Sequence, residues 1–419
     1  MSVCVADLDN FYASCHRVFD PKLRKRPVVV LSNNDGCVIA RSNEAKILGI
    51  PMGAPEFKYR HIFKRYNFAI LSSNFDLYMD MSERNNNILA QYSPIQEMYS
   101  IDESFIDFSG MQSNIDKYAT GMRNHVGKWL GLPISFGIAP TKTLAKVAVK
   151  VAKKFPDITG GIYNIDTETK REKALRWLKV EDIWGIGRKR ALKLNSLGIY
   201  NAWDFTEMPE QTVLHLLTVV GYRIHRELRG IPEIPFETIE KKKSITTTRS
   251  FEREYSTPDE LTERIITFTA LAAERMRKQE SMCKVISLFI ETNPFKEDAP
   301  IKRSMDVKLP FHTLSTIELA HAATDALNKI YVPNRHYKRA GVELTNFIDK
   351  DQYEKRLFDC QNPQSSHFAL MQVIDKINTK YNGQKLRLAS QDEQTEKMRR
   401  EHISPCYTTN FKDAMRVKI

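Results

Sequence analysis

The 419-residue chain lacks any run of about 18 consecutive apolar residues, the length that a transmembrane helix needs. It also lacks a basic and then apolar opening, because Asp7 and Asp9 fall near its start. We therefore expect neither a membrane-spanning helix nor a secretory signal. Internal repeats and low-complexity tracts are absent too, and wholesale disorder is not expected.

Cysteine is scarce, with six residues and no C-x-x-C pair. None is grouped with histidines at zinc-ligand spacing. We expect free thiols in a reducing cytosol rather than a disulfide framework or a zinc site.

Basic residues are in excess, with 63 Lys and Arg against 51 Asp and Glu, which gives a net charge of +12. Without membrane signals, this excess favours a nucleic-acid partner. The hydrophobic fraction of 42% and the charged fraction of 27% are ordinary for a globular protein. The length predicts about three domains.

Residues 141–155 (TKTLAKVAVKVAKKF) predict a helix with an apolar face and a lysine face. The lysine face gathers Lys142, Lys146, Lys150, Lys153 and Lys154. It is either a solvated surface or an anion-binding one. No acid separates these lysines within the helix, and like charges repel, so we favour an anion.

Residues 183–190 (IWGIGRKR) lie between two helical stretches and are similar to a helix–hairpin–helix turn. Two glycines would let backbone N–H groups approach a DNA phosphate, and the next helix N-terminus would face that anion. An ordinary tight helix connection is the alternative, but the three basic residues that follow the turn favour phosphate binding.

Carboxylates stand at the ends of predicted strands. Asp7 ends the strand 3–7, and Asp102 and Glu103 lie between two apolar runs in residues 97–108. Carboxylates that converge at strand ends provide oxygen ligands for Mg²⁺. Neighbours in a regular strand face opposite ways, so Asp102 and Glu103 share a site only at a bend. Two unrelated surface acids are the alternative.

Two aromatic residues, Phe11 and Tyr12, follow the first acid closely. They predict either a piece of the core or a ring that contacts a substrate sugar.

The second half of the chain predicts a βαββαβ order. We expect strands at 243–251, 283–292, 301–309 and 339–347. Helices begin at two capping boxes, Thr257–Glu260 and Ser315–Glu318, and extend to about Met282 and Tyr331.

Together these features resemble the Y-family, or translesion, DNA polymerases. The resemblance is carried by residues 7–14 (DLDNFYAS), 100–103 (SIDE), 137–146 (GIAPTKTLAK) and the turn at 183–190. Within that family, the chain is similar to the UmuC-type catalytic subunit of bacterial DNA polymerase V. That likeness rests on residues 28–41 (VVVLSNNDGCVIAR), 72–74 (SSN) and 404–409 (SPCYTT).

The resemblance implies a role for individual residues. Asp7, Asp102 and Glu103 would be catalytic and, with the carbonyl of Leu8, would bind two Mg²⁺ ions. Tyr12 would be the steric gate against a ribonucleotide 2′-OH. The dNTP would contact Phe11, Tyr12, Asn43, Lys46 and Lys153, and the DNA would contact Gly185, Gly187, Arg188, Lys189 and Arg190. Many relatives carry tyrosine and arginine at 43 and 46, and lysine lacks the bidentate fork of arginine.

The implied fold is an α+β multidomain right hand. Palm would cover 1–10 and 73–165, fingers 11–72, and a helical thumb with the helix–hairpin–helix 166–234. A linker at 235–243 would lead to the βαββαβ little finger at 244–347, and residues 348–419 would form a C-terminal UmuC-type region.

The implied function is error-prone translesion synthesis in the SOS response, by two-metal phosphoryl transfer and without proofreading. The implied partners are primer–template DNA, a processed UmuD-type dimer, a RecA filament and the sliding clamp, in a bacterial cytoplasm at the nucleoid. Leu357 and Phe358 are the candidate clamp contacts, in a motif (EKRLF) that keeps the Leu-Phe pair but has Glu and Lys where relatives carry Gln and Leu. Packing of that pair on the protein's own surface is the alternative.

Two other functions compete with the polymerase. A non-catalytic DNA-binding scaffold predicts lost carboxylates, whereas all three are present. A palm-type nucleotide cyclase would need neither the hairpin nor a DNA-gripping domain.

Overall fold

The computed structural model describes residues 2–111, 114–237, 240–296, 299–352, 364–381, 383, 385–391 and 399–413. The chain divides into two compact units. Unit 1 contains residues 1–238 and 400–419, and unit 2 contains residues 239–399. The expected C-terminal region, 348–419, is thus shared between the two units. No helix among the described residues is long and apolar enough to cross a membrane.

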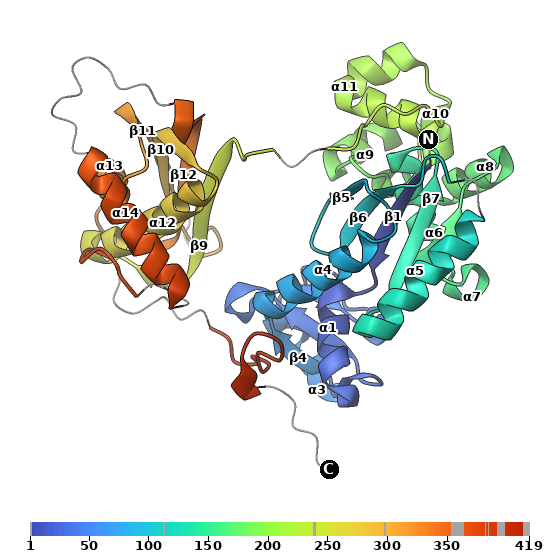
Figure 1. The fold of residues 1–419 in the computed structure, drawn as a ribbon, viewed down its shortest axis with the longest axis horizontal. Helices are drawn as coiled ribbons and strands as arrows, with labels where there is room; N and C mark the ends of the chain where they lie inside the picture. The colour runs from blue at the N-terminus through green and yellow to red at the C-terminus, as the bar shows by residue number, and fades with distance from the viewer. Residues whose placement is uncertain are drawn as a thin grey trace. The chain divides into compact units, whose positions relative to one another are not determined.

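Unit 1 is built around a five-stranded sheet with the order β5-β6-β1-β7-β8 (Figure 1). Its strands are β1 (Val3–Leu8), β5 (Gln96–Met98), β6 (Glu103–Asp107), β7 (Ile134–Ala139) and β8 (Ile162–Asn164). The central strand β1 (VCVADL) is buried throughout and pairs antiparallel with both β6 and β7. Because it is covered on both faces, it has a nearly continuous apolar sequence.

Helices cover each face of this sheet. Val3 and Val5 of β1 pack in one core with α6 (Lys142–Lys154), whereas Cys4, Ala6 and Leu8 pack in another with α4 (Phe75–Leu89) and α5 (Ile115–Leu130). Alternation along the strand therefore turns Asp7 toward the face that α6 covers. Close packing of α6 needs glycine at 137, since a Cβ there would lie 2.2 Å from the backbone nitrogen of Val149.

A three-stranded sheet with the order β3-β2-β4 follows β1 in the chain. It contains β2 (Val28–Leu31), β3 (Val38–Arg41) and β4 (Ala69–Ser72), with β2 antiparallel to β3 and parallel to β4. Its helical elements are α1 (Phe11–Phe19), η1 (Pro21–Leu23), η2 (Asn33–Asp35), α2 (Asn43–Ile47) and α3 (Glu56–Arg65).

Residues 156–237 are mostly helical. The elements are α7 (Pro156–Thr159), α8 (Glu168–Trp177), η3 (Val180–Asp182), α9 (Arg188–Asn195), α10 (Ala202–Thr206) and α11 (Glu210–Leu228). Apolar side chains of α8 to α11 share a core with α6, which fixes this helical part against the sheet.

Unit 2 confirms the predicted βαββαβ order. It contains β9 (Ser244–Tyr255), α12 (Pro258–Lys278), β10 (Ser281–Thr292), β11 (Lys302–Thr313), α13 (Thr316–Ile330) and β12 (Tyr337–Asp349). Its sheet is antiparallel throughout, with the order β11-β10-β12-β9. The predicted extension of the first helix to Met282 is wrong, because Glu280 adopts a left-handed backbone (φ 57°) and Ser281 begins β10.

After unit 2's sheet come η4 (Lys350–Gln352) and α14 (Gln364–Lys380), which packs on unit 2's core through Met371. Arg277 of α12 donates two hydrogen bonds, of 2.6 and 2.8 Å, to the carboxylate of Asp375 on α14. The last described element, η6 (Phe411–Asp413), belongs to unit 1. Five cysteines are free thiols, as predicted, and Cys360 lies outside the described residues.

Candidate active site

The strand pairing brings two of the predicted carboxylates together. Asp7 is directly opposite Glu103 in the antiparallel pair of β1 and β6. Asp7 lies near the end of β1 and Glu103 begins β6, so both are at the same end of this antiparallel pair, and a hydrogen bond links their side chains. Asp102 precedes β6 in a turn, and its carbonyl accepts the Leu8 N–H at 2.9 Å. The bend that the sequence required between Asp102 and Glu103 is therefore present.

Burial controls the charge of this carboxylate pair. Asp7 is 9% exposed, and burial raises its pKa well above its usual range, against the opposing effect of Lys153. Burial also acts to raise the pKa of Glu103, but Lys146 and the hydrogen bond from Asp7 outweigh it, so this pKa is lowered. The pair thus places two hard oxygen donors side by side, and their mutual repulsion is of the kind that a bound cation relieves.

Asp102 stands apart from this pair. Its Oδ1 accepts a hydrogen bond of 2.7 Å from the Ser100 hydroxyl. Its negative charge adds to the effect of burial in raising the pKa of Tyr12, so it faces the aromatic side of the site. Within the described part of the chain, no three His, Cys, Asp or Glu side chains are grouped to hold a metal. The structure thus gathers two of the three predicted ligands.

The lysine face of α6 is not the open anion surface that the sequence favoured. Lys142 is 1% exposed and pairs with Glu97, and Lys146 pairs with Glu103 at 2.5 Å. Lys150 pairs with Asp182 at 3.4 Å, and Lys153 pairs with Asp7. The neutralising acids come from other elements, so the helix sequence by itself could not reveal them.

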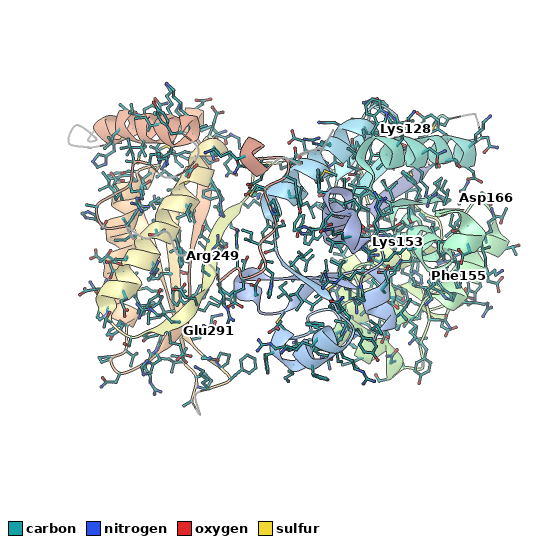
Figure 2. The ribbon with its side chains drawn as sticks, turned by 90° about the horizontal axis from the view of Figure 1, so that it is seen from below. Lys128, Lys153, Phe155, Asp166, Arg249 and Glu291 are labelled. Atoms are coloured by element: carbon teal, nitrogen blue, oxygen red, sulfur yellow. The ribbon has the colours of Figure 1, made fainter. Side chains whose placement is uncertain are left out.

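Lys153 of α6, which is labelled in Figure 2, pairs with the first of the predicted carboxylates, Asp7. It donates to Asp7 and lies 3.3 Å from Asp9, whose two carboxylate oxygens each accept from the Ser135 hydroxyl at 3.0 Å. Asp9 therefore orients Lys153.

The predicted triphosphate contacts on α2 face the same region. Loss of hydration, followed by Lys153 and Arg41, lowers the pKa of Lys46, while Asp9 and Asp7 oppose this. Cations from β3, α2 and α6 thus crowd one another beside the carboxylates, an arrangement that favours a polyanion. Asn43 accepts a 3.0 Å hydrogen bond from Asn10, which joins α2 to the β1–α1 turn.

The aromatic pair is divided between core and site. Phe11 is 3% exposed and packs in the core that α4 and α5 share with the sheet. Tyr12 is half-buried on the first turn of α1. The ring that is available to a ligand is therefore that of Tyr12. The Phe11 ring lies in the core, and its predicted nucleotide contact stays a prediction.

The hairpin turn has a geometry suited to close approach by a ligand. Ile183 and Ile186 are buried, whereas Gly185, Gly187, Arg188 and Lys189 are exposed. Gly185 needs its left-handed backbone (φ 84°), and a Cβ there would lie 2.5 Å from Ile224. Gly187 caps α9, and open space surrounds the position of its Cβ. Arg190 donates to the Gly185 carbonyl at 3.2 Å and so braces the turn.

The candidate clamp contacts, Leu357 and Phe358, lie outside the described residues. Sequence reasoning missed Arg41 and Ser135 at the site, since nothing in a strand sequence shows which loop or helix it meets. Arg41 had a weak local signal, because it comes immediately before Ser42, the N-cap of α2.

Comparison with known proteins shows the family of the chain. The impB/mucB/samB family matches residues 6–150, and its C-terminal domain matches residues 242–357. A domain of unknown function matches residues 369–417. Protein UmuC of Salmonella typhimurium is 39% identical over 419 residues, covering 99% of both chains. DNA polymerase IV 1 of Bacillus subtilis is 28% identical over 389 residues, covering 90% of this chain and 89% of that protein.

Solved structures show the same fold. A Y-family DNA polymerase chimera matches with a TM-score of 0.67 and 23% identity, over 83% of this chain and 100% of the chimera. The insertion ternary complex of Dbh DNA polymerase matches with a TM-score of 0.55 over the same shares. The identity to UmuC over nearly the whole length, together with this fold, shows that the chain belongs to the impB/mucB/samB family, the UmuC-type Y-family DNA polymerases.

Proposed function

We propose that this protein is an error-prone translesion DNA polymerase of the SOS response, which adds dNTPs to a primer 3′-OH opposite damaged template. The observation that carries the proposal is the pairing of Asp7 with Glu103 beside Lys153 and Lys46, with Tyr12 next to them. This reaction needs carboxylates that bind metal ions, lysines that bind the triphosphate, and an aromatic ring that contacts the sugar.

We assign the parts of the hand to the observed bodies. The five-stranded sheet with its helices is the palm (1–10 and 73–165), and the three-stranded sheet is the fingers (11–72). The helical part is the thumb (166–234), and a linker (235–243) leads to the antiparallel sheet of the little finger (244–347).

Asp7, Asp102, Glu103 and the carbonyl of Leu8 are the residues that would hold two Mg²⁺ ions. When bound, these ions lower the pKa of an attacking hydroxyl and neutralise charge on the leaving pyrophosphate. The fit rests on donor chemistry, because Asp7 and Glu103 are hard oxygen donors that lie directly opposite each other.

The chain's own residues would bind and position the substrate. Lys46 and Lys153 would hold the triphosphate, with Asn43 beside them, and Tyr12 would close the space that a 2′-OH needs. Much of the rate enhancement would come from this positioning and from fixed charge. Gly185, Gly187 and the basic residues 188–190 would bind DNA phosphates without reading sequence.

We also propose that the chain has no proofreading activity and that it works with a processed UmuD-type dimer, a RecA filament and the sliding clamp. This part of the proposal rests only on the similarity of the chain to its UmuC-type relatives. Because it would synthesise DNA on damaged template, the protein would act at the nucleoid in a bacterial cytoplasm.

Primer extension tests the proposal. Templates with an undamaged base and with an abasic site are copied with Mg²⁺ and dNTPs, with and without the dimer and the filament. The variants are Asp7→Asn and Glu103→Gln, with Asp107→Asn at the opposite end of β6 as the matched control. We expect extension by the parent and by the control, and at least a 100-fold loss in the two site variants. Incubation of the primer–template without dNTPs checks the absence of proofreading, because the primer should then keep its full length.

Two results would contradict the proposal. Extension that survives in both site variants would move the chemistry elsewhere. Tight DNA binding with no extension under any condition would favour a non-catalytic scaffold.

A further inference from the structure

The ring of Tyr12, to which the proposed function gives the task of excluding ribonucleotides, lies against a second tyrosine. Tyr12 and Tyr78 stack with centroids 4.1 Å apart and planes only 9° from parallel. The Phe75 ring stands edge-on to Tyr12 at 6.1 Å and 86°. One face of the Tyr12 ring is therefore covered by side chains from α4.

Tyr78 is itself held in place. Its side chain is fully buried, and its hydroxyl oxygen lies 2.7 Å from Nε2 of His16. His16 is 1% exposed, and burial lowers its pKa to about 4, so the imidazole is neutral at ordinary pH. Tyr12 and His16 are four residues apart on α1 and share one helix face, so a single tyrosine contacts both.

The first turn of α4 is fixed as well. Asn74 caps the helix by accepting the Leu77 N–H at 3.1 Å. Phe75 and Tyr78 are three residues apart and project from the same side of the helix toward Tyr12. The backing of the ring is thus set by a capped helix rather than by a loop.

A ring excludes a 2′-OH only when it cannot turn aside. An isolated tyrosine on a helix has alternative side-chain rotamers that differ little in energy. We propose that Tyr78, fixed by His16, is a positioning residue that holds the Tyr12 ring and so sets the selection of deoxyribonucleotides over ribonucleotides. Phe75 supports the same ring from its edge. This inference rests on the proposed function, and it assigns Tyr78 no contact with the substrate.

The test is the ratio of kcat/KM for a dNTP to that for the matching rNTP. Tyr12→Ala is the reference variant for the loss of selection. Tyr78→Leu removes the flat backing, and we expect it to lower the ratio about 10-fold while kcat/KM for the dNTP stays within about threefold. Tyr78→Phe keeps the ring and should retain the parent's ratio within about twofold. A merely structural role would change both substrates equally and leave the ratio unaltered.

Phe75→Leu gives a second measurement in case Tyr78→Leu does not fold, because Phe75 is 38% exposed. We expect about a threefold lower ratio. An unchanged ratio in Tyr12→Ala would overturn the proposed role of Tyr12. A lower ratio in Tyr12→Ala, with unchanged ratios in Phe75→Leu and in a folded Tyr78→Leu, would overturn the present inference alone.

A second observation concerns the end of the described chain. Residues 401–407 belong to unit 1 and contact the end of β4. Ser72 N–H donates to the His402 carbonyl at 2.9 Å, and His402 N–H donates to the Ser72 hydroxyl at 3.1 Å. The Asn74 amide donates to the Ser404 hydroxyl at 3.0 Å. Tyr407 stacks on Phe19 of α1, with centroids 4.9 Å apart and planes 7° from parallel.

These contacts join residues more than 300 positions apart, on a surface made by β4, α4 and α1. One backbone hydrogen bond, a buried serine and a stacked ring hold this segment against unit 1. We infer that residues 401–407 are an intramolecular anchor that ties the chain segment after unit 2 to unit 1.

Cleavage of the chain between unit 1 and unit 2 tests the anchor. A protease site is inserted in the full chain between residues 237 and 240, and the cut protein is run on a gel-filtration column. We expect the two pieces of the parent and of the control Lys412→Ala to elute together. The double variant His402→Pro, Tyr407→Ala should elute as two pieces, because it loses a donor and the stacked ring. Separation of the cut parent, or co-elution of the cut double variant, would overturn the inference.

Discussion

The ammonium group of Lys153 bridges Asp7 and Asp9, two acids from the end of β1 and the residue that follows it. It is the largest influence that lowers the pKa of the buried Asp7 carboxyl. A single lysine of α6 thus keeps a buried acid closer to ionisation while it remains within reach of a bound polyanion.

We expect Lys153→Ala to reduce kcat/KM for dNTP incorporation roughly 10- to 100-fold, mainly through KM. Loss of a charge-assisted contact costs about 1.5–3 kcal/mol, and each 1.36 kcal/mol is tenfold in rate. Steady-state single-nucleotide incorporation measures this change. Lys154→Ala is the matched control, because Lys154 is the next residue of the helix and is exposed. Equal effects in the two variants would contradict a specific role for Lys153.

The two hairpin glycines should respond differently to alanine. Gly185→Ala should lower the free energy of unfolding by about 2 kcal/mol, because the backbone is left-handed and the new Cβ would meet Ile224. Gly187→Ala should cost less than about 1 kcal/mol, since the Cβ would enter open space at an N-cap. Urea denaturation followed by tryptophan fluorescence measures both, because all four tryptophans lie in unit 1.

Gly187→Ala, which should cost little stability, should nevertheless weaken DNA binding. Gly187→Ala places a methyl group where a phosphate would approach, so it should weaken primer–template binding while the fold is retained. With about six phosphate contacts, the slope of log K on log salt should be near −5 for the parent and about 1 unit shallower for this variant. A flat salt dependence in the parent would contradict phosphate binding.

Local patterns were sufficient for much of the fold. Capping boxes marked the start of α12 and α13, and the strands expected around them gave the βαββαβ order that the structure confirms. An acid at the end of an apolar strand located Asp7, and the pairing of β1 with β6 brings Glu103 opposite it. The roles of these acids stay predictions.

Long-range partners could not be read from the sequence. The lysine face of α6 looked unpaired, because Glu97, Glu103 and Asp182 belong to other elements and reach it only in the folded chain. The hydrogen bond between Ser72 and His402 likewise joins segments that lie far apart in the sequence, and no local pattern predicts it. Burial then changes charge chemistry, as at Asp7, in a way that composition does not report.

The buried pair of Lys142 and Glu97 should be costly to break on one side. Lys142 is 1% exposed, and its other acceptor is the Pro235 carbonyl at 2.7 Å. Glu97→Ala leaves an uncompensated ammonium and should lower the free energy of unfolding by about 3 kcal/mol. Tryptophan fluorescence in urea measures this loss.

The double variant Lys142→Met, Glu97→Leu removes both charges and should recover most of that loss. Recovery separates the cost of a stranded charge from a simple loss of packing. A double variant as unstable as Glu97→Ala would show that packing, rather than the unpaired ammonium, dominates.

His16 should make unit 1 less stable in mild acid. Burial lowers its pKa to about 4, against about 6.5 in the unfolded chain. Between these values the unfolded state binds more protons, so this contribution is fully present above pH 6.5, is lost as pH falls, and levels off below pH 4. From pH 7 to pH 5 the loss should be about 2 kcal/mol for this group. Urea denaturation of the parent and of His16→Gln at the two pH values measures it. The parent should lose about 2 kcal/mol more than the variant, which cannot titrate at this position, whereas equal losses would place the acid sensitivity elsewhere.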